Sequence, residues 1–241
     1  MPDHADRVAA AYAAAADLSD VGGVSAVVAG VPCLSLGLPY RWATQARPLA
    51  RRSLPGPSVV AELVGWLTAR APQWTIVVRR EHATALDGFT TAEVLPAFRL
   101  AVQPPQVRPP DGLAIGPARD AAEFLAVYGA DLAPLVTERH LAAAGHHHLV
   151  ARLGGSPVGC ARVRIQHRAG YVSGVTVLPA YRRIGIGTAL SAAASRLAGV
   201  RTDLVWLHAN ASSRSIYQRL GYVHVDDHVQ LVPMAQANSA K

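Results

Sequence analysis

Lysine is almost absent from this 241-residue sequence: Lys241 is the only one, and arginine carries the rest of the fixed positive charge. A P-loop requires Gly-Lys-Ser/Thr, so this shortage excludes that class of phosphate site. Cysteine is also scarce. Cys33 and Cys160 lie in apolar runs and outside any Cys-x-x-Cys pair. We therefore expect two buried thiols in a reducing compartment, and no metal site.

Charge is sparse and unevenly distributed. Charged residues make up 16% of the chain and apolar residues 51%, which predicts a folded protein with a substantial core. Nine arginines stand against eight acids before residue 106, and 14 basic residues stand against eight acids after it. The second half is therefore the expected anion-binding half. Its arginines are scattered and not interleaved with aromatic residues, so a nucleic-acid partner is not expected.

A secretory signal is not expected, because Asp3 and Asp6 place the wrong charge at the N-terminus. Residues 21–40 form a stretch of 20 residues without charge, long enough to cross a membrane. Four glycines and two prolines interrupt it, so we interpret it as two short buried strands around a turn. These features predict a soluble, cytoplasmic protein that does not enter a membrane.

Four prolines at residues 102–112 predict an extended linker between two domains. We place a smaller α/β domain at 1–102, the linker at 103–112, a second α/β domain at 113–233 and a tail at 234–241. In the second domain the expected order is two helices followed by ββαβαβ, which predicts a mixed sheet. Residues 36–41 loosely resemble residues 177–182, and this echo suggests an internal duplication.

Residues 175–190, VTVLPAYRRIGIGTAL, are predicted to contain the end of a strand and the start of a helix. Alternation over 171–178 places the odd-numbered residues on one face of the strand, and Pro179 ends its pairing. The helix opens at Gly185 and Gly187, which lack the Cβ atoms that would keep a bulky anion away from free N–H groups. Arg182 and Arg183 add positive charge. This arrangement predicts a site for a pyrophosphate.

A Rossmann dinucleotide site fits these residues less well. It requires a third glycine where Leu190 stands, and an acid at the end of the next strand, whereas Asp203 stands at its start. Tight helix packing remains an alternative reason for the glycines. The run of histidines at 146–148 could suggest a metal, but adjacent side chains diverge, so we predict a turn leading into a strand.

Two motifs resemble those of the GNAT superfamily of N-acetyltransferases. Residues 182–187 match its coenzyme A signature, R/Q-x-x-G-x-G/A after a strand and a proline. NASSRSIYQRLGY, at 210–222, matches its Asn, Tyr and Gly-aromatic spacing. The resemblance covers about 113–233 and implies a mixed, mostly antiparallel sheet flanked by helices. No strand leads into R-x-x-G-x-G in the first half, which would be a degenerate GNAT-like copy.

The resemblance implies a role for each motif residue. The backbones of Val175 and Val177 would pair with the pantetheine arm of coenzyme A, Asn210 would hydrogen-bond that arm, and Tyr217 would face the sulfur as the catalytic hydrogen-bond donor. The remaining positions would hold the pyrophosphate. They are Arg182, Arg183, Ile184, Gly185, Ile186, Gly187 and Thr188.

The function implied by the resemblance is acetyl-CoA-dependent N-acetylation, in which a neutral primary amine attacks the thioester directly and no metal takes part. The acceptor would be a small-molecule or peptide amine, and the oligomeric state stays open. Ser173 stands where many relatives carry a carboxylate, which keeps a non-catalytic acyl-CoA-binding or regulatory module as the alternative. Carboxylates elsewhere are candidate bases: Glu123, Asp131, Glu138, Asp226 and Asp227.

Overall fold

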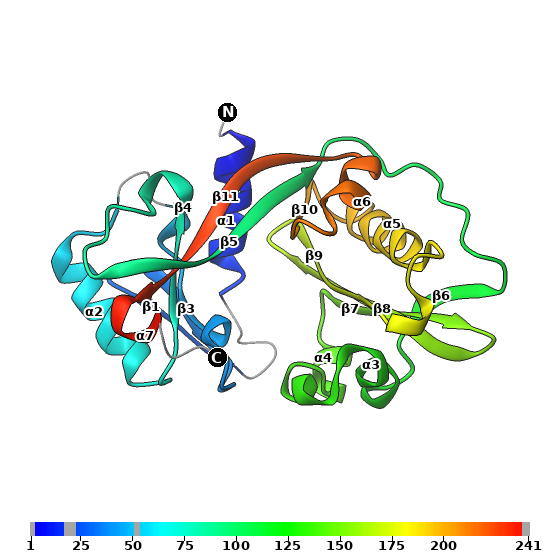
Figure 1. The fold of residues 1–241 in the computed structure, drawn as a ribbon, viewed down its shortest axis with the longest axis horizontal. Coiled ribbons are helices and arrows are strands. Elements are labelled where there is room, and N and C mark those ends of the chain that lie inside the picture. Colours follow the sequence, from blue (N-terminus) through cyan, green and yellow to red (C-terminus); the bar gives the residue numbers. More distant parts are fainter. Residues whose placement is uncertain (1–2, 17–22, 51–53, 238–241) are drawn as a thin grey trace. The chain divides into compact units, whose positions relative to one another are not determined.

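The computed structural model describes residues 3–16, 23–50 and 54–237 (Figure 1). The chain divides into two compact units, a first unit of residues 1–97 and 225–241 and a second unit of residues 98–224. Both divisions fall inside long strands, β5 (Phe89–Leu100) and β11 (Tyr222–Pro233). The C-terminal part of β11 therefore returns to the unit that contains residues 1–97.

In the first unit the strand order is β1-β2-β3-β4-β11-β5. Strands β3 and β4 are parallel and are joined through α2, while β11 pairs antiparallel with β4. Buried apolar side chains of α2, β4 and β11 form the core. The elements, besides parts of β5 and β11, are α1 (His4–Ala14), β1 (Val24–Val28), β2 (Val31–Ser35), η1 (Arg41–Ala43), β3 (Thr44–Ala46), η2 (Pro48–Ala50), α2 (Pro57–Thr68), β4 (Thr75–Arg79), η3 (Arg80–His82) and α7 (Met234–Ala237).

The uncharged stretch at 21–40 forms a hairpin, apart from residues 21–22, which lie outside the described residues. Strands β1 and β2 pair antiparallel around Ala29 and Gly30, which both have positive φ. Burial of both strands is wrong, however: β2 is buried, but β1 is at the end of the strand order and Val27 is 73% exposed. No helix in the described part of the chain is long and apolar enough to span a membrane.

In the second unit the strand order is β5-β10-β9-β8-β7-β6. From β9 to β6 each neighbouring pair is antiparallel, whereas β10 and β9 are parallel. Helices α5 and α6 lie on one side of the sheet, and α3 and α4 on the other (Figure 1). The elements are β6 (Leu113–Pro117), α3 (Ala121–Tyr128), η4 (Ala130–Leu135), α4 (Glu138–Ala142), β7 (His146–Leu153), β8 (Ser156–Gln166), β9 (Ala169–Val177), η5 (Pro179–Tyr181), α5 (Ile186–Gly199), β10 (Leu204–His208) and α6 (Arg214–Arg219).

Helix α5 lies unusually close to the sheet. A Cβ atom at Gly159 would lie 2.7 Å from Leu190 Cδ1, and one at Gly170 would lie 2.8 Å from Ala198 Cβ. Real Cβ atoms do not approach so closely, so both strands need glycine where the helix crosses them. This close approach fixes the position of α5, including its N-terminus, against β9.

We expect Gly170→Ala to lower the free energy of unfolding by ~1–3 kcal/mol, because the new methyl group would meet the Cβ of Ala198, which cannot rotate away. Denaturant unfolding would measure the loss. Gly116→Ala in β6 is the matched control, since its Cβ would lie 3.7 Å from the flexible guanidinium of Arg152. Equal stability of the two variants would show that α5 can shift.

Strand β9 contains a bulge. Its register against β8 shifts between Cys160 and Arg162, and Gly174 lies there with a φ of 61°. Val172, before the bulge, is buried in the core beneath α5, and Val177, after it, lies against the start of α5. The prediction that all odd-numbered residues from 171 to 177 share one face is therefore wrong, because the extra residue reverses the alternation.

The two units share a local arrangement. In the first, β3 leads through α2 to the parallel strand β4; in the second, β9 leads through α5 to the parallel strand β10. The starts of the helices differ. Helix α2 begins with Pro57 after Gly56 in an extended conformation, whereas α5 begins after Gly185 in the left-handed conformation. Proline removes one of the N–H groups that α5 keeps.

Candidate functional site

Strand β9 has an open edge. Its parallel pairing with β10 covers only Ala169–Tyr171 and Leu204–Trp206, whereas its pairing with β8 continues to Val177. Within the described second unit, no strand pairs with residues 172–177 on the side of β10. The two parallel strands thus separate and leave a backbone edge to which an extended ligand could add.

The open edge presents the backbone of the predicted binding residues. The N–H of Leu178 donates to the carbonyl of Val158 on β8 at 3.0 Å. Because alternate residues direct their backbone groups to opposite sides of a strand, Val175 and Val177 direct theirs to the open edge. The carbonyl of Val177 accepts a 2.9 Å bond from Arg182 Nε. The N–H group of Val177 points to the open edge, where no strand of the described second unit pairs with it.

The turn after β9 leads into α5, whose first N–H groups are not capped by a side chain at its N-cap. Arg183 and Gly185 both have positive φ, 69° and 94°, and residues 182–185 are exposed. The first backbone bond closing α5 runs from Ala189 N to the carbonyl of Gly185, and no side chain caps the helix. The N–H groups of residues 186–188 therefore have no partner within the helix, as phosphate binding requires.

The two glycines are not explained by packing within the protein. A Cβ at Gly185 would lie 3.8 Å from Pro110, and one at Gly187 would lie 3.7 Å from Val177, both ordinary van der Waals distances. Gly185 is favoured by its positive φ. Gly187 has no such conformational reason, so the space above it fits a ligand that approaches the backbone closely.

Asn210 joins β10 to α6. Its Oδ1 accepts bonds from the N–H of Ser213 at 3.0 Å and from the hydroxyls of Ser212 and Ser213, each at 2.8 Å. The side-chain carbonyl thus organises the start of α6. The predicted bond to a ligand must then come from the amide NH₂ group, which lies on an exposed residue.

Tyr217, on α6, is 7% exposed and packs edge-on against Tyr222 at 5.7 Å between ring centroids. Burial raises its pKa above the ordinary value, and a hydrogen bond with Ser191 acts in the opposite direction. The phenol therefore stays protonated at neutral pH and can donate a hydrogen bond. The ring of Tyr217 also packs in the hydrophobic core of the second unit.

Three of the candidate bases, Glu123, Glu138 and Asp131, lie in the second unit. Each of them already interacts with another group of the protein. Arg152 bonds both carboxylate oxygens of Glu123, at 2.7 and 2.6 Å, and these bonds lower the pKa of Glu123. Glu138 accepts from the N–H of Ala121 at 2.8 Å. Asp131 lies in η4 and has an interaction partner of its own.

The other two candidate bases belong to the first unit. Arg79 bonds Asp226 at 2.8 Å, and Arg80 bonds Asp227 at 2.7 Å. Both pairs join β11 to the segment where β4 passes into η3, within that unit. None of the five carboxylates stands out as a base beside the open edge of β9.

Sequence reasoning missed His208. Tyr171 and Trp206 are the last paired residues of β9 and β10, so Ser173 and His208 follow at the point where the strands separate. The Tyr171 hydroxyl lies 3.5 Å from His208 Nδ1. The signal was the alternation in LVWLH, which places Trp206 and His208 on one face.

Helix α3 closes over the bulge of β9. A Cβ at Gly174 would lie 2.9 Å from the Tyr128 ring and 3.3 Å from Arg162 Cδ. Asp120 starts α3 by accepting from the N–H of Glu123 at 2.7 Å. Tyr128 and Arg162 therefore cover the side of β9 that faces away from α5.

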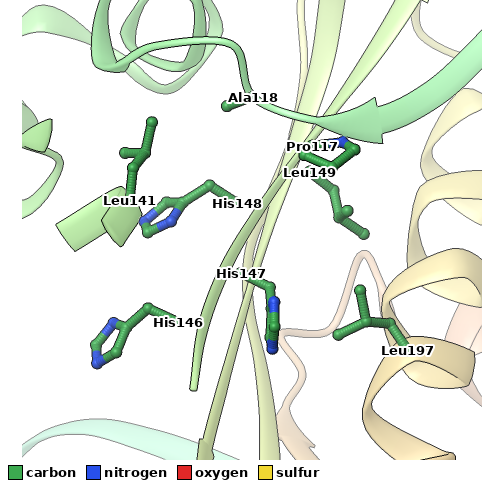
Figure 2. A pocket seen from close by; sticks show the side chains of 8 residues that line it. All are labelled: Pro117, Ala118, Leu141, His146, His147, His148, Leu149 and Leu197. Atoms are coloured by element: carbon green, nitrogen blue, oxygen red, sulfur yellow. The ribbon is translucent and has the colours of Figure 1, made fainter. Parts of the chain in front are cut away.

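The histidine run forms the first three residues of strand β7 and is not a turn that precedes it. The three histidines, with Leu197 among the other residues, line a cavity of about 140 Å³. In Figure 2 His146 and His148 lie on one side of the strand, and His147 and Leu197 on the other. Burial, then the charge of Arg162, lowers the pKa of His148 to about 3. No group of three or more potential ligands suited to a metal ion occurs in the described residues.

Residues 144–224 match the family model described as "Acetyltransferase (GNAT) domain". A protein of Bacillus subtilis (strain 168) named "Putative acetyltransferase" is 32% identical over 76 residues, which are 31% of this chain. The chain spans about half the length, 52%, of that curated relative.

Solved structures share the fold. A GCN5-related N-acetyltransferase from Kribbella flavida matches with a TM-score of 0.75 at 20% identity, over 97% of both chains. One from Sphaerobacter thermophilus matches with a TM-score of 0.59 at 21% identity, over 84% of this chain and 76% of that one. A tandem GNAT protein from the clavulanic acid biosynthesis pathway matches with a TM-score of 0.58 at 15% identity, over 84% and 77%. At these identities the likeness concerns the fold.

Proposed function

We propose that this chain, whose residues 144–224 match the GNAT acetyltransferase domain, is an acetyl-CoA-dependent N-acetyltransferase. The observation that carries this proposal is the continuity of two backbone sites. The open edge of β9 runs directly into the uncapped N-terminus of α5. A ligand with an extended amide arm joined to a pyrophosphate matches both, and coenzyme A has that chemistry.

On the donor side, the N–H groups of Val175 and Val177 would pair with the pantetheine amides, and Asn210 would donate from its NH₂ group. The backbone of residues 183–188, with the charge of Arg182 and Arg183, would hold the pyrophosphate. Gly185 and Gly187 fit this role, because packing within the protein does not require either glycine: a Cβ there would meet its neighbours only at ordinary van der Waals distances.

In the proposed reaction a neutral amine attacks the acetyl thioester and forms a C–N bond. The C–S bond breaks, its electron pair leaves on the thiolate of coenzyme A, and the nitrogen gives its surplus proton to water. Tyr217 would then supply a proton. A tyrosine titrates near 10 and a thiol near 8.5, so transfer to the thiolate is uphill by about 2 kcal/mol. Burial raises the pKa of Tyr217 further. Tyr217 is therefore a hydrogen-bond donor that completes the transfer only as charge develops on sulfur.

The acceptor side lacks a strand carboxylate, since Ser173 occupies that position. The amine must arrive neutral, or lose its proton through water or His208. The same absence favours the second candidate function, a non-catalytic acyl-CoA-binding module. In both cases we propose that the second unit alone carries the coenzyme A site, and that the first unit is the degenerate copy, because Pro57 removes an N–H group at the corresponding helix start.

Thiol release from acetyl-CoA, followed in the presence of a panel of primary amines, tests the proposal. We expect release that depends on the amine, with the acetylated amine found by mass spectrometry, and one coenzyme A per chain by calorimetry. Binding without amine-dependent release from any member of a broad panel would favour the regulatory module. Two equivalent sites per chain would contradict a degenerate first unit.

A further inference from the structure

Arg162 is a half-buried arginine on the side of the sheet that faces α3 and α4. On β8 it stands between His148 of β7 and Ser173 of β9. Residues directly opposite in neighbouring strands share a face. His148 contacts Phe124 of α3, with 5.0 Å between ring centroids, which identifies that face. The face is opposite to the one that α5 covers.

The side chain of Arg162 lies at the reactive end of the proposed donor site. Its Cδ would contact a Cβ at Gly174 at 3.3 Å, so it crosses the bulge where the open edge of β9 begins. The phosphate cradle lies beyond the other end of that edge, at the start of α5. An arm bound along Val177 and Val175, with its phosphates at the cradle, points its thioester toward the bulge.

The positive charge of Arg162 has little compensation from other groups in the described part of the protein. Within the described part of the chain its guanidinium donates to the Tyr128 hydroxyl at 3.4 Å, a long contact, and lies 5.8 Å from the centroid of that ring. Arg152, on the neighbouring strand, has by contrast a bidentate partner in Glu123. A partly desolvated guanidinium without a carboxylate favours an anionic ligand.

The acetyl donor, acetyl-CoA, does not supply the anionic group that would bind Arg162. Its phosphates belong at residues 183–188, and the pantetheine arm that would reach the bulge is uncharged. The anion must therefore arrive with the other substrate. Arg164 lies on the same face, two residues along β8.

We propose that the acceptor is an amine that carries a carboxylate group, and that Arg162 binds this carboxylate beside the bulge of β9. This inference rests on the proposed acetyl transfer and specifies its second substrate. The planar guanidinium suits a bidentate carboxylate. It would hold the acceptor by its acid group while the amine reaches toward the thioester.

Matched acceptors test the proposal: an α-amino acid, its α-amide and its decarboxylated amine, for several side chains. We expect kcat/KM to be ~10- to 150-fold higher for the acid, the range of a charge-assisted hydrogen bond. β-Alanine and 2-aminoethylphosphonate distinguish a carboxylate from a phosphonate, and we expect preference for β-alanine. Equal rates for acid, amide and decarboxylated amine, or preference for the phosphonate, would overturn the proposal while acetyl transfer stands.

Variants connect this preference to one residue. Arg162→Met should raise KM for the carboxylate-bearing acceptor by ~10- to 150-fold and abolish the discrimination against the decarboxylated amine. Arg162→Lys keeps the charge but loses the fork, so it should retain only part of the preference. Arg196→Met, on the exposed side of α5, removes the same charge elsewhere and should keep the preference.

Binding of acetyl-CoA to each variant, measured by calorimetry, reports whether the donor site is folded. Preference retained by a folded Arg162→Met protein would overturn the assignment to Arg162. If no amine is acetylated by the unmodified protein, the proposed function itself fails, and the two failures are thereby distinguished.

Discussion

Gly187→Glu is expected to weaken acetyl-CoA binding by ~100-fold or more. The variant places a carboxylate and a Cβ atom where the pyrophosphate would meet the first N–H groups of α5, so attraction is replaced by repulsion. The fold should survive, because the new Cβ would lie 3.7 Å from Val177, an ordinary contact. Calorimetry gives the Kd, and thermal unfolding shows whether the variant is folded.

Two variants separate the causes of this loss. Gly187→Ala adds the Cβ without the charge and should weaken binding by less. Arg196→Gln lowers the net charge by one on the exposed side of the same helix, and its Kd should remain within about twofold at physiological salt. An unchanged Kd in a folded Gly187→Glu protein would overturn the assignment of the cradle.

Tyr217→Phe is expected to lower kcat by ~10- to 1000-fold with little change in the Kd of acetyl-CoA, because its hydrogen bond would strengthen only as the thiolate forms. The phenylalanine ring keeps the contact with Tyr222. Burial raises the pKa of Tyr217 above its ordinary value near 10. The donor form is thus present through neutral pH, and its deprotonation should not lower the rate below about pH 10.

Tyr222→Phe is the matched control. It also removes one buried tyrosine hydroxyl, which bonds Ser195 at 2.8 Å. Its loss should reduce stability by ~1 kcal/mol, with kcat within about twofold. Single-turnover measurements would establish that chemistry limits the rate. If Tyr217→Phe then reacts as fast as Tyr222→Phe, Tyr217 serves packing only.

The turn after β9 and the start of α5 could be predicted because their signals are local. A proline that ends a strand, two glycines and a helical period stand within 16 residues, from Val175 to Leu190, and each acts on its own neighbours. The family spacing around Asn210 and Tyr217 is equally local. The histidines at 146–148 begin strand β7, where adjacent side chains point to opposite sides of the strand.

The bulge in β9, the exposure of β1 and the position of Arg162 depend on contacts between strands, which residue spacing along the sequence does not reveal. The bulge at Gly174 reversed the alternation of β9, and a periodicity of two contains no signal for one extra residue. The exposed position of β1 follows from its place at the end of the sheet. Arg162 was overlooked because its significance comes from its cross-strand neighbours, His148 and Ser173.

The return of β11 to the first unit has a consequence for synthesis on the ribosome. Strand β4 pairs with residues 228–231, and Val229 and Leu231 are buried in the core of that unit. Domains usually fold in the order in which they emerge. Here the unit translated first cannot complete its sheet until the final strand has left the exit tunnel, so a nascent chain that stalls near residue 224 exposes the unfinished core to chaperones.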